Sequence, residues 1–321
     1  MEKKKYNVLI IGAGDIGSEY DSPLSRDYLT HAHAFTDHTG FNLIGFVDPN
    51  FESAKKASLK WNVDFFLTID EAYSTNHIDV VSVAAPDEVH YSILKEIVKY
   101  KPNFVLAEKP LTLSVIEAKE IVEIYKRIPA IVNFKRRFIP EINSLKEKIS
   151  NNNFGEFVFG TSYYGKGFKH NGSHLINLLL FLLENEWDYK EIIDRVIDYK
   201  EEDPTFSILL KDTKRETSFL IKAFNESNFS IFEFDLFFTK GRIRITDLGF
   251  TIEEHVNQKN QNFKGFTTLK KVDTYNTSLE SSLLLTANHI YDHLINGTEL
   301  YCTLGEVFKE MKFTEQIIKS I

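Results

Sequence analysis

Short apolar runs alternate with amphipathic stretches along the first part of the chain. Short, mainly apolar runs are typical of strands buried on both faces. They fall at residues 8–11, 42–47, 78–84, 103–107 and 130–134, and the run at 8–11 is unbroken. Helical patterns lie between them at residues 51–61, 69–75, 89–100 and 114–126. This alternation predicts a parallel, doubly wound sheet of α/β class, whose ligands bind outside the carboxyl ends of the strands.

The pattern changes after about residue 150, where several strands follow one another with little helix between them. Strands are expected at residues 156–164, 194–200, 206–211, 217–224, 231–239, 242–247 and 251–258, with helices at 173–183, 278–295 and 305–320. We therefore predict a nucleotide-binding Rossmann domain over residues 1–128. Residues 129–321 are predicted to form an α+β domain with a largely antiparallel open sheet, for substrate binding and for assembly as a homodimer or homotetramer.

The first apolar run leads directly into a glycine-rich turn. Its glycines Gly12, Gly14 and Gly17 enclose Asp15 and Ile16 and have the spacing of the dinucleotide-binding fingerprint. Gly12 permits a tight turn, Gly14 lets the backbone approach a diphosphate, and Gly17 leaves room for a helix to pack. We expect the diphosphate of a nicotinamide dinucleotide to lie against this turn.

Asp48 ends the second predicted strand, where the fingerprint expects an acid that bonds the ribose hydroxyls. A carboxylate there repels a 2′-phosphate, so NAD is favoured over NADP. The separation from Gly17 exceeds the roughly 20 residues that the fingerprint expects. The excess is assigned to a polar insertion, residues 19–30, which either folds over the cofactor or substrate or is peripheral.

Composition narrows the class of protein. Its 321 residues, 43% hydrophobic and 26% charged, suit a two-domain soluble protein. The net charge of −8 argues against nucleic acid or an anionic membrane as partner. The single cysteine allows no intrachain disulfide and is consistent with a cytoplasmic location.

Two further loops follow predicted strands and should join the glycine turn at the same edge of the sheet. Cofactor contacts are expected from the first loop and from the Glu-Lys-Pro segment of the second, at Ala85, Pro86, His90, Glu108 and Lys109. His90 has the alternative role of capping and packing its helix.

Six segments in this order carry a resemblance to a known family: IIGAGDIG, GFVDPN, AAPDEVHY, AEKPLTLSVIEAKEIV, VNFKRRFIP and NGSHLINLLLFLL. The chain resembles the Gfo/Idh/MocA (glucose–fructose oxidoreductase / inositol dehydrogenase) family of NAD(P)-dependent oxidoreductases, which act mostly on sugars and cyclitols. The resemblance implies that Lys109 is the active-site lysine and His174 the active-site histidine. An imidazole suits the transfer of the hydroxyl proton, and an ammonium stabilises the developing charge on oxygen.

The chain departs from the family at two positions. The family commonly has Asp four residues before the histidine, where this sequence has His170. Either His170 or His174 is therefore the base, or His170 binds substrate. Two histidines at this spacing also suggest a metal, but no metal is predicted because no further ligands lie nearby. The family often has Asn where Lys135 stands.

Basic residues suggest an anionic substrate. The run Lys135-Arg136-Arg137 would hold a carboxylate or phosphate, or would be a solvated turn. The predicted substrate contacts are Lys109, Arg136, Arg137, Tyr164, Lys166, His170, Asn171 and His174. The favoured function is a sugar dehydrogenase or reductase acting on a CH–OH group, with a nucleotide-linked or acidic sugar of surface-polysaccharide biosynthesis as substrate. The alternative is a non-catalytic NAD(P)-sensing regulator on the same fold.

Overall fold

The computed structural model describes residues 4–320, which divide into two compact units. Unit 1 extends to Phe138 and includes Glu280–Lys309, and unit 2 comprises Ile139–Leu279 and the chain from Glu310 onward. The sequence predicts a single domain boundary after residue 128. The compact units part at Phe138, and the later segment Glu280–Lys309 belongs to unit 1. None of the helices in the described range has the length and apolar character needed to cross a membrane.

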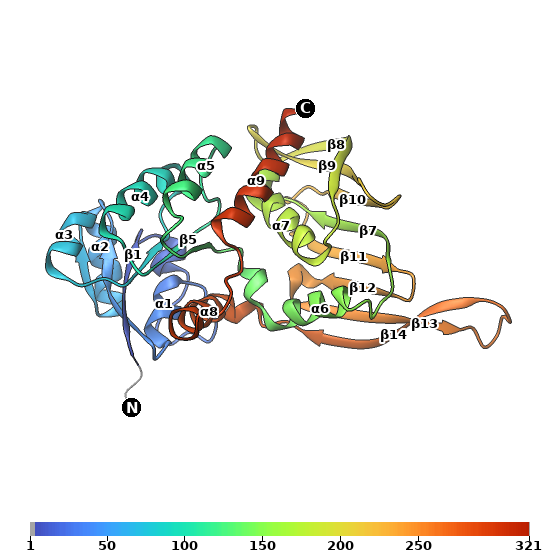
Figure 1. Ribbon diagram of the computed structural model, residues 1–321, viewed down its shortest axis with the longest axis horizontal. Helices are drawn as coiled ribbons and strands as arrows, with labels where there is room; N and C mark the ends of the chain where they lie inside the picture. The colour runs from blue at the N-terminus through green and yellow to red at the C-terminus, as the bar shows by residue number, and fades with distance from the viewer. Residues whose placement is uncertain (1–3, 321) are drawn as a thin grey trace. The chain divides into compact units, whose positions relative to one another are not determined.

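Unit 1 contains a parallel sheet with the strand order β3-β2-β1-β4-β5-β6, of which Figure 1 labels β1 and β5. Its strands are β1 (Tyr6–Ile11), β2 (Phe41–Val47), β3 (Asp64–Phe66), β4 (Val80–Val83), β5 (Phe104–Ala107) and β6 (Ala130–Val132). Its helices are α1 (His31–Asp37), α2 (Phe51–Trp61), α3 (Ile69–Thr75), α4 (His90–Ile97), α5 (Val115–Ile124) and α8 (Ser282–Asn296). The strand order reverses between β1 and β4, which is where such sheets bind their ligands.

The local sequence accounts for these elements. Val8, Leu9 and Ile10 of β1 are fully buried, as an unbroken apolar run requires in a sheet covered on both faces. Side chains just before the helices accept hydrogen bonds from their first turns. Asn50 caps α2 and Ser114 caps α5 in this way.

Unit 2 is built on an eight-stranded sheet with the order β14-β13-β12-β11-β7-β10-β9-β8. All neighbouring pairs are antiparallel except β7 and β10. The strands are β7 (Phe157–Tyr164), β8 (Trp187–Lys200), β9 (Asp203–Asp212), β10 (Ser218–Ala223), β11 (Phe232–Phe238), β12 (Gly241–Thr246), β13 (Thr251–Lys259) and β14 (Thr267–Asn276). The predicted combination of a Rossmann sheet and an α+β unit is confirmed.

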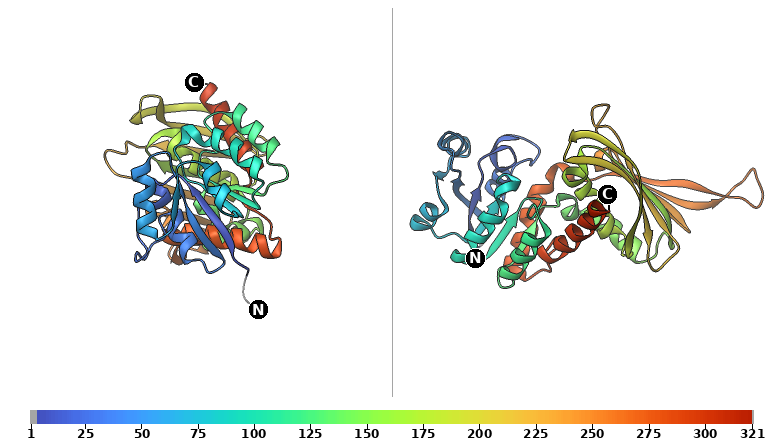
Figure 2. Two further views of the ribbon diagram at one scale, coloured as in Figure 1. Left: turned by 90° about the vertical axis from the view of Figure 1, so that its left-hand side faces the viewer. Right: turned by 90° about the horizontal axis from the view of Figure 1, so that it is seen from above.

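The helices α6 (Pro140–Ser150) and α7 (Ser173–Leu182) lie on one face of this sheet (Figure 2). Leu175, Leu178 and Leu179 of α7 join a core with Phe219 and Phe234 of the strands. The helix α9 (Leu304–Lys319) begins in unit 1 and ends in unit 2. Strand β14 was missed by sequence analysis because nearly all its side chains are exposed and show no apolar alternation.

Candidate functional site

The glycine turn has the backbone conformation that its sequence predicts. Gly12 has φ +103°, and a Cβ built on it would lie 2.4 Å from the Ala84 carbonyl oxygen. Only glycine fits there. Gly14 is exposed, and a Cβ at this position would meet no atom within 4 Å. The outer side of the turn is therefore accessible at Gly14, as the close approach of a diphosphate requires.

Asp48 lies beside this turn. Its Oδ2 accepts a hydrogen bond from the Ala13 N–H at 2.9 Å, and its Oδ1 accepts one from the Asn50 N–H at 2.9 Å. The structure thus brings together two predicted cofactor-binding elements that are far apart in the sequence. The glycine turn then enters a five-residue π-helix, Asp15–Glu19, and α1 begins only at His31. Asp15 within the turn is exposed, and Ile16 is half-buried.

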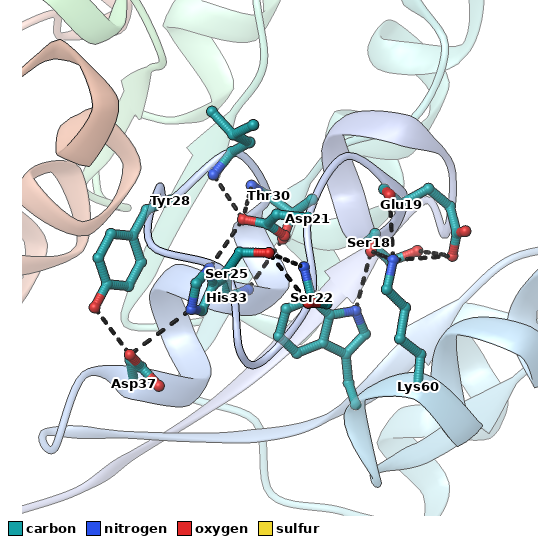
Figure 3. Close-up of polar contacts among 12 residues, drawn as sticks. Ser18, Glu19, Asp21, Ser22, Ser25, Tyr28, Thr30, His33, Asp37 and Lys60 are labelled. Carbon is teal, nitrogen blue, oxygen red and sulfur yellow. Dashed lines mark hydrogen bonds and ion pairs between the residues drawn. The ribbon is translucent and has the colours of Figure 1, made fainter.

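The insertion at residues 19–30 is held by one buried carboxylate (Figure 3). Asp21 accepts hydrogen bonds from the Leu29 and Thr30 N–H groups at 2.7 and 3.2 Å and from the Thr30 hydroxyl at 2.5 Å. The Nδ1 of His33 lies 2.9 Å from the same carboxylate. Tyr28 stacks on His33 with ring centroids 4.3 Å apart. These contacts fold the insertion onto the start of α1.

The start of the insertion is also tied to α2. The Ser18 carbonyl accepts hydrogen bonds from Lys60 Nζ at 2.7 Å and from the Trp61 indole N–H at 3.1 Å (Figure 3). Glu19 forms an ion pair with Lys56 at 2.6 Å. Because Ser18 follows Gly17 directly, the insertion and the glycine turn share these supports.

His90 joins the two other loops at this edge of the sheet. Its fully buried ring has Nδ1 2.7 Å from the Pro110 carbonyl oxygen and Nε2 2.9 Å from that of Ala85. A carbonyl oxygen only accepts hydrogen bonds, so a ring nitrogen that carries a proton donates to the carbonyl that it faces. These two contacts support the alternative role of His90, which is to pack its helix. Direct contacts of His90 and Pro86 with a cofactor stay predictions.

Glu108 is the centre of a buried polar network. Its Oε1 lies 3.0 Å from His31 Nε2 and accepts a hydrogen bond from Asn133 Nδ2 at 2.6 Å. Its Oε2 accepts one from the Lys109 N–H at 3.2 Å. His31 is fully buried, and its Nδ1 lies 2.7 Å from the Ser82 hydroxyl.

Two opposing effects act on the ionisation of Glu108. Burial alone would raise the pKa of this carboxyl. The hydrogen bond and charge of His31, together with Asn133 and Lys109, outweigh burial and hold the pKa of Glu108 below its usual range. Glu108 is thus a carboxylate that fixes the backbone of Lys109.

The three residues of the basic run after β6, Lys135-Arg136-Arg137, differ in their surroundings. Arg137 is buried and pairs with Glu306, with an N···O distance of 2.8 Å. Burial lowers the pKa of Arg136 to about 10. Burial and the charge of Arg136 lower the pKa of Lys135 to about 8, with Glu108 opposing them and Lys109 adding to them. Arg137 therefore has a carboxylate partner within unit 1.

In unit 2, the segment before α7 is held by acidic residues from the neighbouring hairpin. Asp203 accepts hydrogen bonds from the backbone N–H groups of Lys169 at 2.7 Å and His170 at 2.9 Å. Asp198 accepts one from the Lys166 N–H at 2.7 Å. The His170 ring stacks on Tyr199 with centroids 4.7 Å apart.

The remaining predicted substrate residues of unit 2 differ in exposure. His174 lies in the first turn of α7, and both it and Asn171 are half-buried. Asn171 donates through Nδ2 to the Gly165 carbonyl at 3.0 Å. Tyr164 is fully buried, donates to the Phe206 carbonyl at 3.0 Å and accepts from the Phe206 N–H at 2.9 Å. This burial weighs against a direct contact between Tyr164 and substrate.

Comparison with known proteins agrees with the geometry of unit 1. Residues 6–134 match the Gfo/Idh/MocA family, described as an oxidoreductase family with an NAD-binding Rossmann fold. The matched residues lie in unit 1 and make up less than half of the chain.

Proteins similar to this chain extend the comparison. The inositol 2-dehydrogenase of Corynebacterium glutamicum strain R is 27% identical over 162 residues, which are 48% of this chain and 44% of that protein. The matched stretch therefore spans less than half of that relative's length.

Solved structures match nearly the whole chain at low identity, and this likeness shows the fold alone. A putative NADPH-dependent oxidoreductase from Desulfitobacterium hafniense has a TM-score of 0.79 and 16% identity, covering 98% of this chain and 95% of that one. A UDP-N-acetylglucosamine 3-dehydrogenase from Acidithiobacillus ferrooxidans has a TM-score of 0.75 and 16% identity, covering 99% and 98%.

Three members of the Glu108 network were not predicted from the sequence. Ser82, His31 and Asn133 lie on β4, on α1 and just after β6, and none stands in a motif with Glu108. The one usable signal was the register of parallel strands. Asn133 follows β6 by one residue as Glu108 follows β5, so the two are neighbours at the strand ends.

Proposed function

We propose that this chain is a member of the Gfo/Idh/MocA family and an NAD(P)-dependent sugar oxidoreductase. It would transfer a hydride between nicotinamide and a carbinol or carbonyl carbon of a sugar. One observation supports this most strongly: four cofactor elements follow four adjacent parallel strands. Asp48 follows β2, the glycine turn follows β1, the Ala85 loop follows β4 and Lys109 follows β5, in the sheet order β2-β1-β4-β5.

The chemistry assigns a role to each residue. Bound NAD(P) would supply the hydride acceptor or donor. On oxidation the C–H bond breaks with its electron pair, while the O–H proton goes to an imidazole, that of His174 or His170. The Lys109 ammonium holds the oxygen while a carbonyl forms, and reduction runs through the same steps in reverse. Lys166, Arg136 and Asn171 are proposed to contact the substrate.

Asp48 supports NAD as the cofactor. Its carboxylate is held by the N–H groups of Ala13 and Asn50, and its charge would repel a 2′-phosphate. We expect tighter binding of NADH than of NADPH, and Asp48→Ser should narrow the difference. Nicotinamide fluorescence titrations with both cofactors measure this. Equal preference in the two proteins would contradict the role of Asp48.

The decisive test replaces the proposed active-site lysine. Lys109→Met should abolish turnover and leave NADH binding nearly unchanged, because the ammonium acts on substrate oxygen. The assay follows the absorbance of reduced nicotinamide with a panel of sugars, acidic sugars and nucleotide sugars. Lys126→Met is the matched control, because Lys126 is an exposed lysine that pairs with the exposed Glu123. Full activity of Lys109→Met would overturn the mechanism.

A non-catalytic NAD(P) sensor is the second candidate, supported by the histidine that stands at position 170 in place of the family's acid. NADH binding without turnover on the whole panel would favour the sensor.

We also propose a cytoplasmic homodimer or homotetramer that associates through unit 2, where Val158, Ile193 and Ile197 are 48%, 53% and 55% exposed. Light scattering coupled to size exclusion tests the assembly.

A further inference from the structure

Lys135 lies at the edge of the sheet that carries Lys109. Strands β5 and β6 are parallel and in register, with Ala107 opposite Val132. The ladder continues past the strands, because the Asn133 N–H donates to the Ala107 carbonyl at 2.8 Å. Lys135 opens the short 3-10 helix Lys135–Phe138 directly afterwards. Its ammonium is near enough to Glu108 and Lys109 for both charges to act on it.

Within residues 4–320, no carboxylate lies within 4.0 Å of Lys135 Nζ and no group forms a hydrogen bond with it. The negative charge of Glu108 acts on this ammonium, but both Glu108 oxygens already bind other donors. Lys135 is nevertheless only partly exposed. A half-buried cation without a counter-ion is costly, which indicates a ligand that supplies the negative charge.

The groups packed around this helix do not neutralise Lys135. Arg136 and Lys109 are positive and lower its pKa further, after the larger effect of burial. The carboxylate of Glu306 pairs with Arg137. From α8, His289 packs against Phe138 with ring centroids 5.3 Å apart, and burial lowers the pKa of this histidine.

We propose that Lys135 is a substrate-binding residue whose ammonium pairs with a carboxylate or phosphate of the sugar. This inference rests on the proposed oxidoreductase function and adds the substrate class to it. It also explains the departure from the family's usual Asn, since an amide binds a neutral hydroxyl whereas an ammonium favours an anion. Arg137 is a weaker candidate for binding this anion because its guanidinium already pairs with Glu306.

The proposal has a pH signature. Lys135, with a pKa of about 8, is charged at pH 7 and loses its charge as the pH rises above 8. A bound anion favours the charged form of Lys135, so at a pH above this pKa the protein takes up a proton when the anion binds. KM for an anionic sugar should therefore rise above pH 8, whereas KM for a neutral sugar should not change with this group.

The first experiment needs no known substrate. The protein with NADH bound is labelled with trace acetic anhydride across pH, and each lysine is followed by mass spectrometry. Lys135 should become reactive at lower pH than the exposed Lys126. Glucuronate, glucose 6-phosphate and UDP-glucose are then added separately, and at least one should slow labelling of Lys135 and not of Lys126. The effective probe distinguishes a carboxylate, a monophosphate and a diphosphate. Unchanged labelling with all three would overturn the proposal.

The second experiment uses Lys135→Asn with Lys126→Asn as the matched control. The ratio of kcat/KM for the preferred anionic sugar to that for a neutral sugar should fall roughly 10- to 100-fold in Lys135→Asn, as for the loss of a charge-assisted hydrogen bond. The control should keep the wild-type ratio. An unchanged ratio in an active Lys135→Asn protein refutes the role of Lys135 and leaves the oxidoreductase function standing. If the wild type turns over no sugar, the oxidoreductase function fails, and the labelling result alone decides whether Lys135 binds anions.

Discussion

Replacing Glu108 by Gln should destabilise unit 1 strongly. The carboxylate lies against three donor groups, on His31, Asn133 and the Lys109 backbone. A glutamine of the same shape has one acceptor oxygen instead of two, and its NH₂ group faces a donor. A hydrogen bond to a charged group contributes about 1.5–3 kcal/mol. We therefore expect the free energy of unfolding to fall by about 2–4 kcal/mol near pH 7.

The same substitution should change the acid dependence of stability. The pKa of Glu108 is lower in the folded chain than its usual value of 4.5. The unfolded chain therefore binds more protons in that range, and the contribution of Glu108 is fully present above pH 4.5. It is lost as pH falls from there through the folded pKa. The difference between wild type and Glu108→Gln should shrink over this acidic range.

Urea unfolding followed by tryptophan fluorescence measures both effects. A Trp187→Phe background leaves Trp61 of α2 as the reporter of unit 1. The control is Glu123→Gln, which removes an exposed ion pair with Lys126 and should cost less than about 1 kcal/mol. The network would be refuted as a source of stability if the free energy of unfolding of Glu108→Gln lay within about 1 kcal/mol of the wild-type value, or depended on acidic pH as the wild type does.

Three further substitutions test separate contacts. Gly12→Ala places a Cβ 2.4 Å from the Ala84 carbonyl oxygen in a residue with φ +103°. The substitution should therefore reduce both the affinity for NADH and the midpoint of thermal unfolding. Wild-type values of both would contradict the close contact between residue 12 and Ala84. Tyr164→Phe removes both hydrogen bonds to the Phe206 backbone and should cost roughly 2–4 kcal/mol in urea unfolding; a cost under 1 kcal/mol would mean that those groups find other partners. Asp21→Asn introduces an NH₂ where the carboxylate accepts several donors, so amide exchange across residues 19–30 should accelerate with little change elsewhere. Unchanged exchange there would show that the insertion is held by other contacts.

The elements that sequence analysis predicted well are those whose signal is local. Val8, Leu9 and Ile10 form an unbroken apolar run because β1 is buried on both faces. The glycine turn was predictable because Gly12 adopts a conformation that other residues avoid. Strand β14 lacked any such signal, since its side chains face solvent and its pairing with β13 is carried by the backbone.

The Glu108 network could not be predicted because its members come from different elements. His31 has an ordinary helical context, and nothing in its neighbourhood in the sequence points to Glu108. Their distance of 3.0 Å depends on where α1 packs against the sheet. The exception is Asn133, whose place follows from strand register once β5 and β6 are known to be neighbours. Topology, rather than local pattern, assembles this part of the site.

Acidic neighbours account for the histidine at position 170. Asp203 already accepts the backbone N–H of residue 170 at 2.9 Å, and Asp198 holds the nearby Lys166 N–H. The family's usual aspartate at position 170 would add a further negative charge to this segment, and like charges at such distances repel. An imidazole avoids that repulsion and also stacks on the Tyr199 ring, which a carboxylate does not do. The departure from the family is therefore compatible with the local electrostatics of unit 2, so it does not by itself argue that the protein has lost its chemistry.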